Sequence, residues 1–261
     1  MSALLDGPLV APGGGGASVT LASLGGLAAG PAATGDATLH WKCDETSGST
    51  LANSGSGLSG NLAIAGAPVL GLPHPHGRGV RFSGLVADRA EGASGVALST
   101  SAVTVLALVV ASSLPGTYAQ IVRRLRDAPG VATDCAASIA LNNTGDGRIA
   151  VALHIGGALR GLTSALPYAL RAGVPHLVGL RYDGAAFDLL LDGKVAATAA
   201  HTGALDWTAG VWELGVDRNF DAGGLSPWSG WIGDVRVHET ALTDAEVRAL
   251  YYQSVSRWSA P

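Results

Sequence analysis

The stretch WSGWIGDVRVHETALTDAEVRALY, residues 228–251, combines two hydrophobic patterns of different period. Apolar and polar residues alternate over 228–238, which is typical of a strand with one buried face. Ile232 falls on the polar side of that alternation, so we expect a β-bulge at the glycine that follows it. Thr243 and Glu246 then have the spacing of a helix capping box. The apolar stripe of the expected helix consists of Val247, Leu250 and Tyr251. The chain is therefore expected to end in a closing strand and one short helix packed on a sheet.

Two Asp-Gly pairs, Asp183-Gly184 and Asp192-Gly193, stand between runs of alternating residues. Such pairs suit the positive φ angles of tight hairpin turns, so this region predicts an antiparallel meander. Upstream, VTVLALVV at 103–110 is apolar throughout, has strand length and contains four Val. It predicts a central strand that is covered on both faces.

The composition limits both the fold and the partners. The chain has 261 residues, of which 48% are hydrophobic and 14% charged, which suits one large β domain with an extra segment. A formal net charge of -4, with only two Lys, supplies no electrostatic reason to expect nucleic acid. No apolar run reaches the roughly 18 residues of a membrane span, so no membrane insertion is expected.

These motifs resemble the LamG-like (laminin G-like) domains of the concanavalin A-like lectin-glucanase jelly-roll family. The family's closing pattern, aromatic-x-Gly-x-Ile-Asp-Asp-Val-Arg-Ile followed by Ala-Leu-Ser/Thr-x-x-Glu-Ile, is matched within 228–251, with Gly233 in place of the first Asp. Its Asp-Glu-x-Ser-Gly-x-Thr is matched at 44–50, and its Tyr-Asp-Gly and Leu-x-x-Asp-Gly at 182–193. The resemblance covers about residues 38–252. It implies an all-β sandwich of two antiparallel sheets with one short C-terminal helix.

The first residues differ from the rest, so we divide the chain into an N-terminal Gly/Ala-rich arm, 1–37, and a jelly-roll domain, 38–261. Residues 1–35 contain no Lys or Arg and include four consecutive Gly. One interpretation is a flexible linker; the other is an assembly arm whose apolar residues pack on a neighbouring subunit. The apolar residues of this arm are Val19, Leu21, Leu24 and Leu27. The basic start of a secretory signal is missing, so we expect a protein made in a host cytoplasm.

Enzymatic activity is not expected. Polysaccharide-cutting enzymes of this fold class carry clustered carboxylates, typically Glu-x-Asp-x-x-Glu, which supply the acid and the nucleophile. That motif is absent from the sequence, as is the Gly-x-Ser-x-Gly of a nucleophile elbow. The sequence therefore names no catalytic residue.

The resemblance implies a different kind of site, a calcium ion at the rim between the first and last strands. If these strands pair, the candidate ligands are Asp44, Glu45 and Asp234. Ca²⁺ takes six to eight oxygen ligands, and Gly233 removes one carboxylate that the family pattern has. The alternative is that Asp44 and Glu45 only cap the loop that follows them.

Aromatic residues supply the candidates for sugar binding. Trp212, Trp228 and Trp231 lie in strand-like sequence and are expected in the core. Trp207 and Trp258 lie in loop-like sequence, where an exposed indole ring stacks on the apolar face of a pyranose. Packing under a loop is the alternative for both.

Other polar residues leave alternatives open. Cys43 and Cys135 are bonded if their strands are neighbours, although we favour free thiols. Arg123-Arg124 marks either an acidic ligand or, as we favour, a solvated strand end. His176 is expected to be a core or rim histidine with a satisfied hydrogen bond.

Two functions agree with these features. We favour a structural component of a bacteriophage particle, a tail-tip, minor tail or capsid-surface protein. LamG-like domains are frequent in such proteins, and the Gly-rich arm without basic residues or an export signal is the feature that favours this function. Its expected partners are other virion proteins, further copies of itself and host-surface glycans. The alternative is a free bacterial carbohydrate-binding module or adhesin.

Overall fold

The computed structural model describes most of the chain after residue 35. The described residues are 36–57, 59–74, 77–93, 96, 98–99, 101–125, 135–206, 210–217 and 227–259, and within them the side chains of 72–74, 77 and 256–259 are not described. The arm residues Val19, Leu21, Leu24 and Leu27 lie outside this part, so the division at residue 37 stays a prediction. No helix in the described part is both long and apolar enough to cross a membrane.

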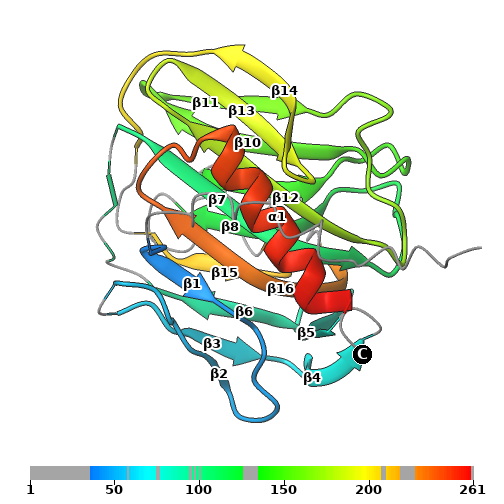
Figure 1. Ribbon diagram of the computed structural model, residues 1–261. Helices are drawn as coiled ribbons and strands as arrows, with labels where there is room; N and C mark the ends of the chain where they lie inside the picture. Colours follow the sequence, from blue (N-terminus) through cyan, green and yellow to red (C-terminus); the bar gives the residue numbers. More distant parts are fainter. Residues whose placement is uncertain are drawn as a thin grey trace, which may run out of the picture. The chain divides into compact units, whose positions relative to one another are not determined.

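Two antiparallel sheets of eight strands form a sandwich (Figure 1). The first sheet contains β1 (Leu39–Trp41), β4 (Val69–His74), β5 (Gly77–Ser83), β7 (Val103–Ala111), β12 (Pro175–Tyr182), β13 (Ala186–Leu191), β14 (Lys194–Ala200) and β16 (Ser229–His238). Its order is β14-β13-β12-β7-β16-β5-β4, with β1 also paired to β16. The second sheet contains β2 (Thr50–Leu51), β3 (Leu62–Ala65), β6 (Arg89–Gly92), β8 (Ala119–Leu125), β9 (Cys135–Leu141), β10 (Ile149–Ile155), β11 (Ala158–Thr163) and β15 (Trp212–Leu214). Its order is β11-β10-β9-β8-β15-β6-β3-β2. The expected all-β sandwich is confirmed.

The main core lies between the sheets and is built around large aromatic side chains. Trp41, Trp212 and Trp228 are completely buried. The rings of Trp41 and Trp212 meet edge to face with their centroids 5.9 Å apart, a preferred geometry for aromatic pairs. The core position expected for Trp212 and Trp228 is confirmed.

Strand β7 is central and buried on both faces, as its sequence predicted. One side of the strand, which includes Val105, contributes to the core between the sheets. The other side, Leu106, Leu108 and Val110, packs in a second apolar cluster with the helix α1 (Asp244–Ser259). Figure 1 shows this helix, in red, crossing the outer face of the first sheet. The helix is what allows a strand with apolar residues on both sides.

The N-terminus of α1 is a capping box, as predicted. The backbone N–H of Thr243 donates to Oε2 of Glu246 at 2.8 Å, and the N–H of Glu246 donates to Oγ1 of Thr243 at 3.3 Å. The apolar stripe that follows seals the second cluster: Val247 and Leu250 are buried and Tyr251 is half-buried. The helix extends beyond this stripe to Ser259.

The expected bulge in β16 is present, and it explains which faces Trp231 and Ile232 occupy. The pairing with β7 shifts register between Gly233 and Arg236, and Asp234 has φ of 51°. Because a bulge inserts one extra residue, the alternation of inward and outward side chains changes sign there. Ile232 therefore lies in the core between the sheets, while Trp231 lies on the opposite face in the cluster under α1.

The hairpin β13–β14 turns at Asp192-Gly193, whose φ angles are 52° and 76°, as a two-residue turn of this kind requires. The Asp192 carboxylate also closes the turn. Its Oδ1 accepts from the backbone N–H of Leu177 at 3.0 Å, and its Oδ2 contacts His176 Nδ1 at 2.8 Å. His176 Nε2 accepts from the backbone N–H of Arg171 at 3.1 Å, so the expected satisfied histidine is confirmed.

Candidate functional site

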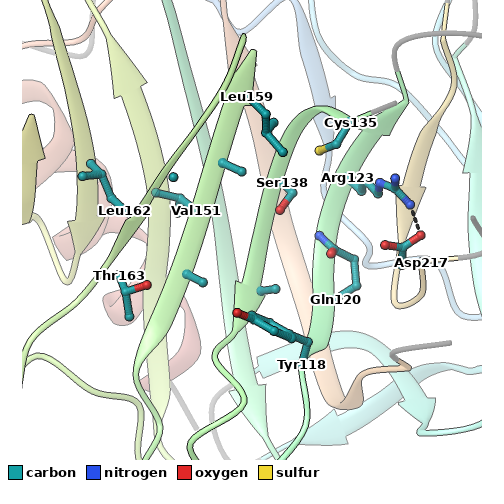
Figure 2. Close-up of a pocket in the computed structure, with 14 residues that line it drawn as sticks. Tyr118, Gln120, Arg123, Cys135, Ser138, Val151, Leu159, Leu162, Thr163 and Asp217 are labelled. Atoms are coloured by element: carbon teal, nitrogen blue, oxygen red, sulfur yellow. Dashed lines mark ion pairs between the residues drawn. The ribbon is translucent and has the colours of Figure 1, made fainter. Parts of the chain in front are cut away.

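A groove of about 400 Å³ lies on the outer face of the second sheet, over strands β8 to β11 (Figure 2). It is lined by Tyr118, Gln120, Arg123, Cys135, Ser138, Ala140, Ala150, Val151, Ala152, Leu159, Gly161, Leu162, Thr163 and Asp217. Most of these residues alternate with core residues along their strands, because successive side chains of a strand point to opposite faces.

The groove floor consists of two rows of residues that pair across four strands. One row is Arg123, Ser138, Ala152 and Gly161, and the other is Gln120, Ala140, Ala150 and Thr163. The first row runs from the charged Arg123 through Ser138 to the small residues Ala152 and Gly161, and the second has Ala140 and Ala150 between the polar Gln120 and Thr163. The groove therefore exists because Ala and Gly stand where larger outward-facing residues would fill the space.

Tyr118 and Leu159 lie at opposite ends of the groove in Figure 2, and they are 40% and 51% exposed. Both are large apolar groups that water still reaches. Tyr118 immediately precedes β8, and its side chain is the aromatic ring of the groove lining. Neither residue was selected from the sequence, although the alternation of Tyr118 with Gln120 is visible there.

Gln120 presents an oxygen to the groove because its nitrogen is already engaged. The amide Nε2 donates to the carbonyl oxygens of Val122 and Ile139, at 2.6 and 3.0 Å. These bonds satisfy backbone carbonyls at a register shift of β8, where Ile121 has no partner in β9. The side-chain Oε1 is then the part of Gln120 that can accept a hydrogen bond from a ligand.

Arg123 and Arg124 do not form the solvated strand end that we favoured. Arg123 is 3% exposed and forms an ion pair with Asp217 at one edge of the groove. Arg124 is 1% exposed, and its guanidinium lies 5.5 Å from the ring centroid of Trp212. Burial lowers the pKa of Arg124 to about 10. Both cations are buried because the neighbouring strand β15 and the residues after it supply partners that the local sequence does not reveal.

The three expected calcium ligands are not arranged around a common metal site. Asp234 is buried, and its carboxylate accepts from His40 Nε2 at 2.6 Å and from Arg236 Nη2 at 2.9 Å. Glu45 Oε1 accepts from a backbone N–H at 2.8 Å, and the Asp44 side chain is exposed. No three His, Cys, Asp or Glu side chains within the described ranges are placed to hold a metal ion. The cation beside the Asp234 carboxylate in the described structure is the protein's own Arg236.

The same contacts set the charge state of Asp234. Burial raises the pKa of a carboxylate, but the hydrogen bond from His40 and the charge of Arg236 outweigh it and hold the pKa of Asp234 well below its usual range. The first and last strands do pair, with His40 opposite Arg236. Asp234 therefore acts as an ionic link between the first strand and the bulge of the closing strand.

The remaining predicted positions separate into tested and untested ones. Cys43 and Cys135 are both buried and unbonded, so the favoured free thiols are confirmed. Trp207 lies outside the described residues. Trp258 belongs to α1, but its side chain is not among those described. A sugar-binding role for either tryptophan stays a prediction.

A sequence profile described as concanavalin A-like lectin/glucanases superfamily matches residues 86–248. The chain belongs to this superfamily. The match includes all four strands of the groove, the whole closing strand and the start of the helix, up to residue 248. No curated protein shows significant sequence similarity to the chain.

Solved structures share the concanavalin A-like fold at low sequence identity. Domain 4 of AbnA, an arabinanase of Geobacillus stearothermophilus solved with arabinotriose, is 18% identical with a TM-score of 0.61, over 83% of this chain and 98% of that domain. The ligand-binding domain of botulinum neurotoxin serotype D, solved with N-acetylneuraminic acid, is 11% identical with a TM-score of 0.61, over 87% of this chain and 54% of that one. The Trypanosoma rangeli sialidase is 14% identical with a TM-score of 0.61, over 85% of this chain and 33% of that one. The chain spans about half the length of the neurotoxin domains, and these likenesses concern the fold alone.

Proposed function

We propose that the groove on the second sheet binds a neutral segment of a glycan without cleaving it. The observation that carries this proposal is the pair of cross-strand rows, in which small residues form the floor and polar or charged side chains flank them on β8, β9 and β11. A volume of about 400 Å³ falls within the range of small-ligand sites. A flat floor of Ala and Gly lets a sugar ring lie against the sheet, and the polar ends are placed to reach its hydroxyl groups.

The chemistry of the lining suits this ligand class. Gln120 Oε1 accepts a hydrogen bond, while the hydroxyls of Ser138 and Thr163 both donate and accept. The exposed ring of Tyr118 offers an apolar surface with a polar tip, a combination that suits a pyranose. These contacts supply orientation at the ends of the groove and apolar contact in the middle.

The same lining supports binding rather than hydrolysis. Glycoside hydrolysis usually needs two carboxyl groups, one as acid and one as nucleophile or base. Asp217 is the carboxylate in the groove lining, and it forms an ion pair with Arg123. A carboxylate held by a guanidinium is stabilised in its charged form, which opposes a role as general acid.

Filling the groove should weaken binding without unfolding the protein. Ala152 faces outward on β10 and is partly exposed. Ala152→Trp should lower the affinity for a groove ligand by at least about tenfold, because the indole occupies the floor. Tyr118→Ala should lower the affinity by up to about tenfold, because the contact between the tyrosine ring and the ligand is lost. A glycan array that includes arabinotriose and N-acetylneuraminic acid would identify the ligand, and calorimetry would measure the variants.

The control for this experiment is Ala200→Trp, at an exposed position on edge strand β14 of the other sheet. It adds the same side chain at a position that does not line the groove and should leave the affinity unchanged. Equal affinity of the Ala152→Trp and Ala200→Trp proteins would place the ligand elsewhere. Absence of binding to every sugar on the array would leave a purely architectural role.

We further propose that the domain is displayed on a bacteriophage particle, where many copies make weak binding useful. The support is the LamG-like pattern together with the apolar residues Val19, Leu21, Leu24 and Leu27 in the N-terminal segment. Exposed apolar surface is unfavourable by about 25 cal/mol per Å², so such residues favour packing on a neighbour. A free bacterial carbohydrate-binding module or adhesin is the alternative.

Deleting residues 2–35 tests this second proposal. The truncated protein should remain soluble, with a β-dominated circular dichroism spectrum, and should no longer join the oligomer or particle that the full chain joins. Sedimentation and co-purification would compare the two proteins. Equal assembly of both would show that the segment is a linker and would favour the free module.

A further inference from the structure

A second cavity, of about 510 Å³, lies between residues 167–176, the turn of the β13–β14 hairpin and helix α1. It is formed by the first sheet and its covering helix, so it shares no residue with the groove on the second sheet. Its charged and aromatic lining includes Arg171, Lys194, Arg248, Tyr168, Tyr251 and Tyr252.

The lining is positive although the chain as a whole carries a net charge of -4. Arg171, Lys194 and Arg248 are all exposed, and none of them forms an ion pair with a described residue. Asp192 is the acidic residue of the lining, so the formal charge there is three positive minus one negative, or +2. Three cations around one cavity repel one another unless an anion enters, because like charges at close range are unfavourable.

Asp192 is not available to neutralise them, because both of its carboxylate oxygens already have partners. Oδ1 accepts from the backbone N–H of Leu177, and Oδ2 is bound by Nδ1 of His176. The other ring nitrogen of His176, Nε2, accepts from the backbone N–H of Arg171, so Nδ1 is the nitrogen that donates to Asp192. The three cations therefore keep their hydrogen-bond donors for a ligand.

The cavity wall is held in place by a close backbone approach. A Cβ atom built on Gly193 would lie 3.1 Å from Cα of Arg248 and 3.2 Å from Cβ of Tyr251. The hairpin turn thus packs directly on α1, which brings Lys194 and Arg248 to one side of the cavity. The rings of Tyr251 and Tyr252 lie 5.4 Å apart, and Tyr168 and Tyr252 are 38% and 63% exposed.

We propose that this cavity binds an acidic saccharide, with its anionic group against Arg171, Lys194 and Arg248 and its ring against the exposed tyrosines. The volume leaves room for a sugar ring beside the anionic group. The aromatic faces would add nothing to the binding of a bare inorganic ion, whereas they suit a pyranose. The anionic group is a carboxylate or a sulfate ester, since guanidinium and ammonium groups bind both.

The experiment uses the full chain and three saccharides in calorimetric titrations. These are an oligogalacturonate, its methyl ester, which differs only by the lost charge, and a sulfated oligosaccharide. The native protein should bind the oligogalacturonate, the sulfated oligosaccharide or both, and should bind the methyl ester at least about tenfold more weakly. Binding should also weaken when NaCl is raised from about 0.05 to about 0.5 M, because salt screens exposed charges.

The double variant Lys194→Glu/Arg248→Glu should lose about tenfold or more in affinity for the acidic ligand. Its matched control is Lys42→Glu/Arg81→Glu, which changes the net charge equally at exposed positions outside the cavity. The control should lose less than about twofold in affinity for the acidic ligand. Ala152→Trp in the groove should leave this affinity unchanged. Equal loss in both charge variants, equal affinity for the methyl ester, or equally tight binding of inorganic sulfate would overturn the proposal.

Discussion

Replacing Asp234 with alanine is expected to lower the free energy of unfolding by about 3–5 kcal/mol, the cost of breaking a buried ion pair by removing one partner. The carboxylate is 4% exposed and holds His40 and Arg236, with a further hydrogen bond from the Ser254 hydroxyl at 3.3 Å. Without it, the positive charge of Arg236 loses the counter-charge that it has in the described part of the structure. Urea unfolding followed by Trp fluorescence measures the effect.

Two further substitutions separate the ionic contribution from the backbone contribution at this position. Asp234 has φ of 51°, a region that Asn tolerates better than Ala and Gly tolerates best. Asp234→Asn keeps an acceptor and the backbone preference, so it should be the mildest change. Asp234→Gly removes the carboxylate without backbone strain. Its loss in the free energy of unfolding should therefore be about 1 kcal/mol smaller than the loss caused by Asp234→Ala.

The matched control is Asp44→Ala, which removes an exposed carboxylate from the same predicted calcium set. It should change stability by no more than about 0.5 kcal/mol, as surface substitutions usually do. A cost for Asp44→Ala that equals the cost for Asp234→Ala would show that the two carboxylates act together, as metal ligands would. The ionic link described for Asp234 would then be wrong.

The protein is expected to lose about 3 kcal/mol of stability as the pH falls from about 6.5 to about 4, because of His238. This side chain is 4% exposed, and its Nε2 has no hydrogen-bond partner in the described part of the chain. Burial, followed by the charges of Arg236 and His40, lowers the pKa of His238 to about 4, against a weaker opposite effect of Glu246. In the unfolded chain a histidine has a pKa near 6.5. Below that pH, His238 takes up a proton in the unfolded state but stays neutral in the folded state, so acid favours unfolding.

His238→Gln tests this expectation, since glutamine cannot take up a proton. Between pH 6.5 and 4, the free energy of unfolding of the variant should fall by about 3 kcal/mol less than that of the native protein. This difference should hold whatever the stability of the variant at pH 7. The contribution of Asp234 has a separate window. The lowered pKa of Asp234 places its stabilisation above about pH 3.9, and it is lost as the pH falls further. An unchanged slope between pH 6.5 and 4 in His238→Gln would contradict the assignment to His238.

Local sequence determined the elements whose structure depends on neighbouring residues. The capping box of α1, the Asp192-Gly193 turn and the apolar strand β7 were all predicted correctly. Their geometry depends on hydrogen bonds or side-chain alternation within a few residues, which a single stretch of chain contains. The bulge of β16 was predicted for the same reason, from the odd parity of Ile232. The cluster that buries Trp231 depends on the position of α1, which the local pattern does not contain.

Only the tertiary structure decided where polar and small residues meet. The groove floor joins Arg123, Ser138, Ala152 and Gly161 through the pairing register of four strands. Asp234 finds its partner His40 from 194 residues away. A calcium site and an ionic link place the same carboxylate at the same rim, and the sequence does not distinguish them. What distinguishes them is which side chain the folded sheets bring within hydrogen-bond distance, because burial of a charge requires a specific partner in space rather than one nearby along the chain.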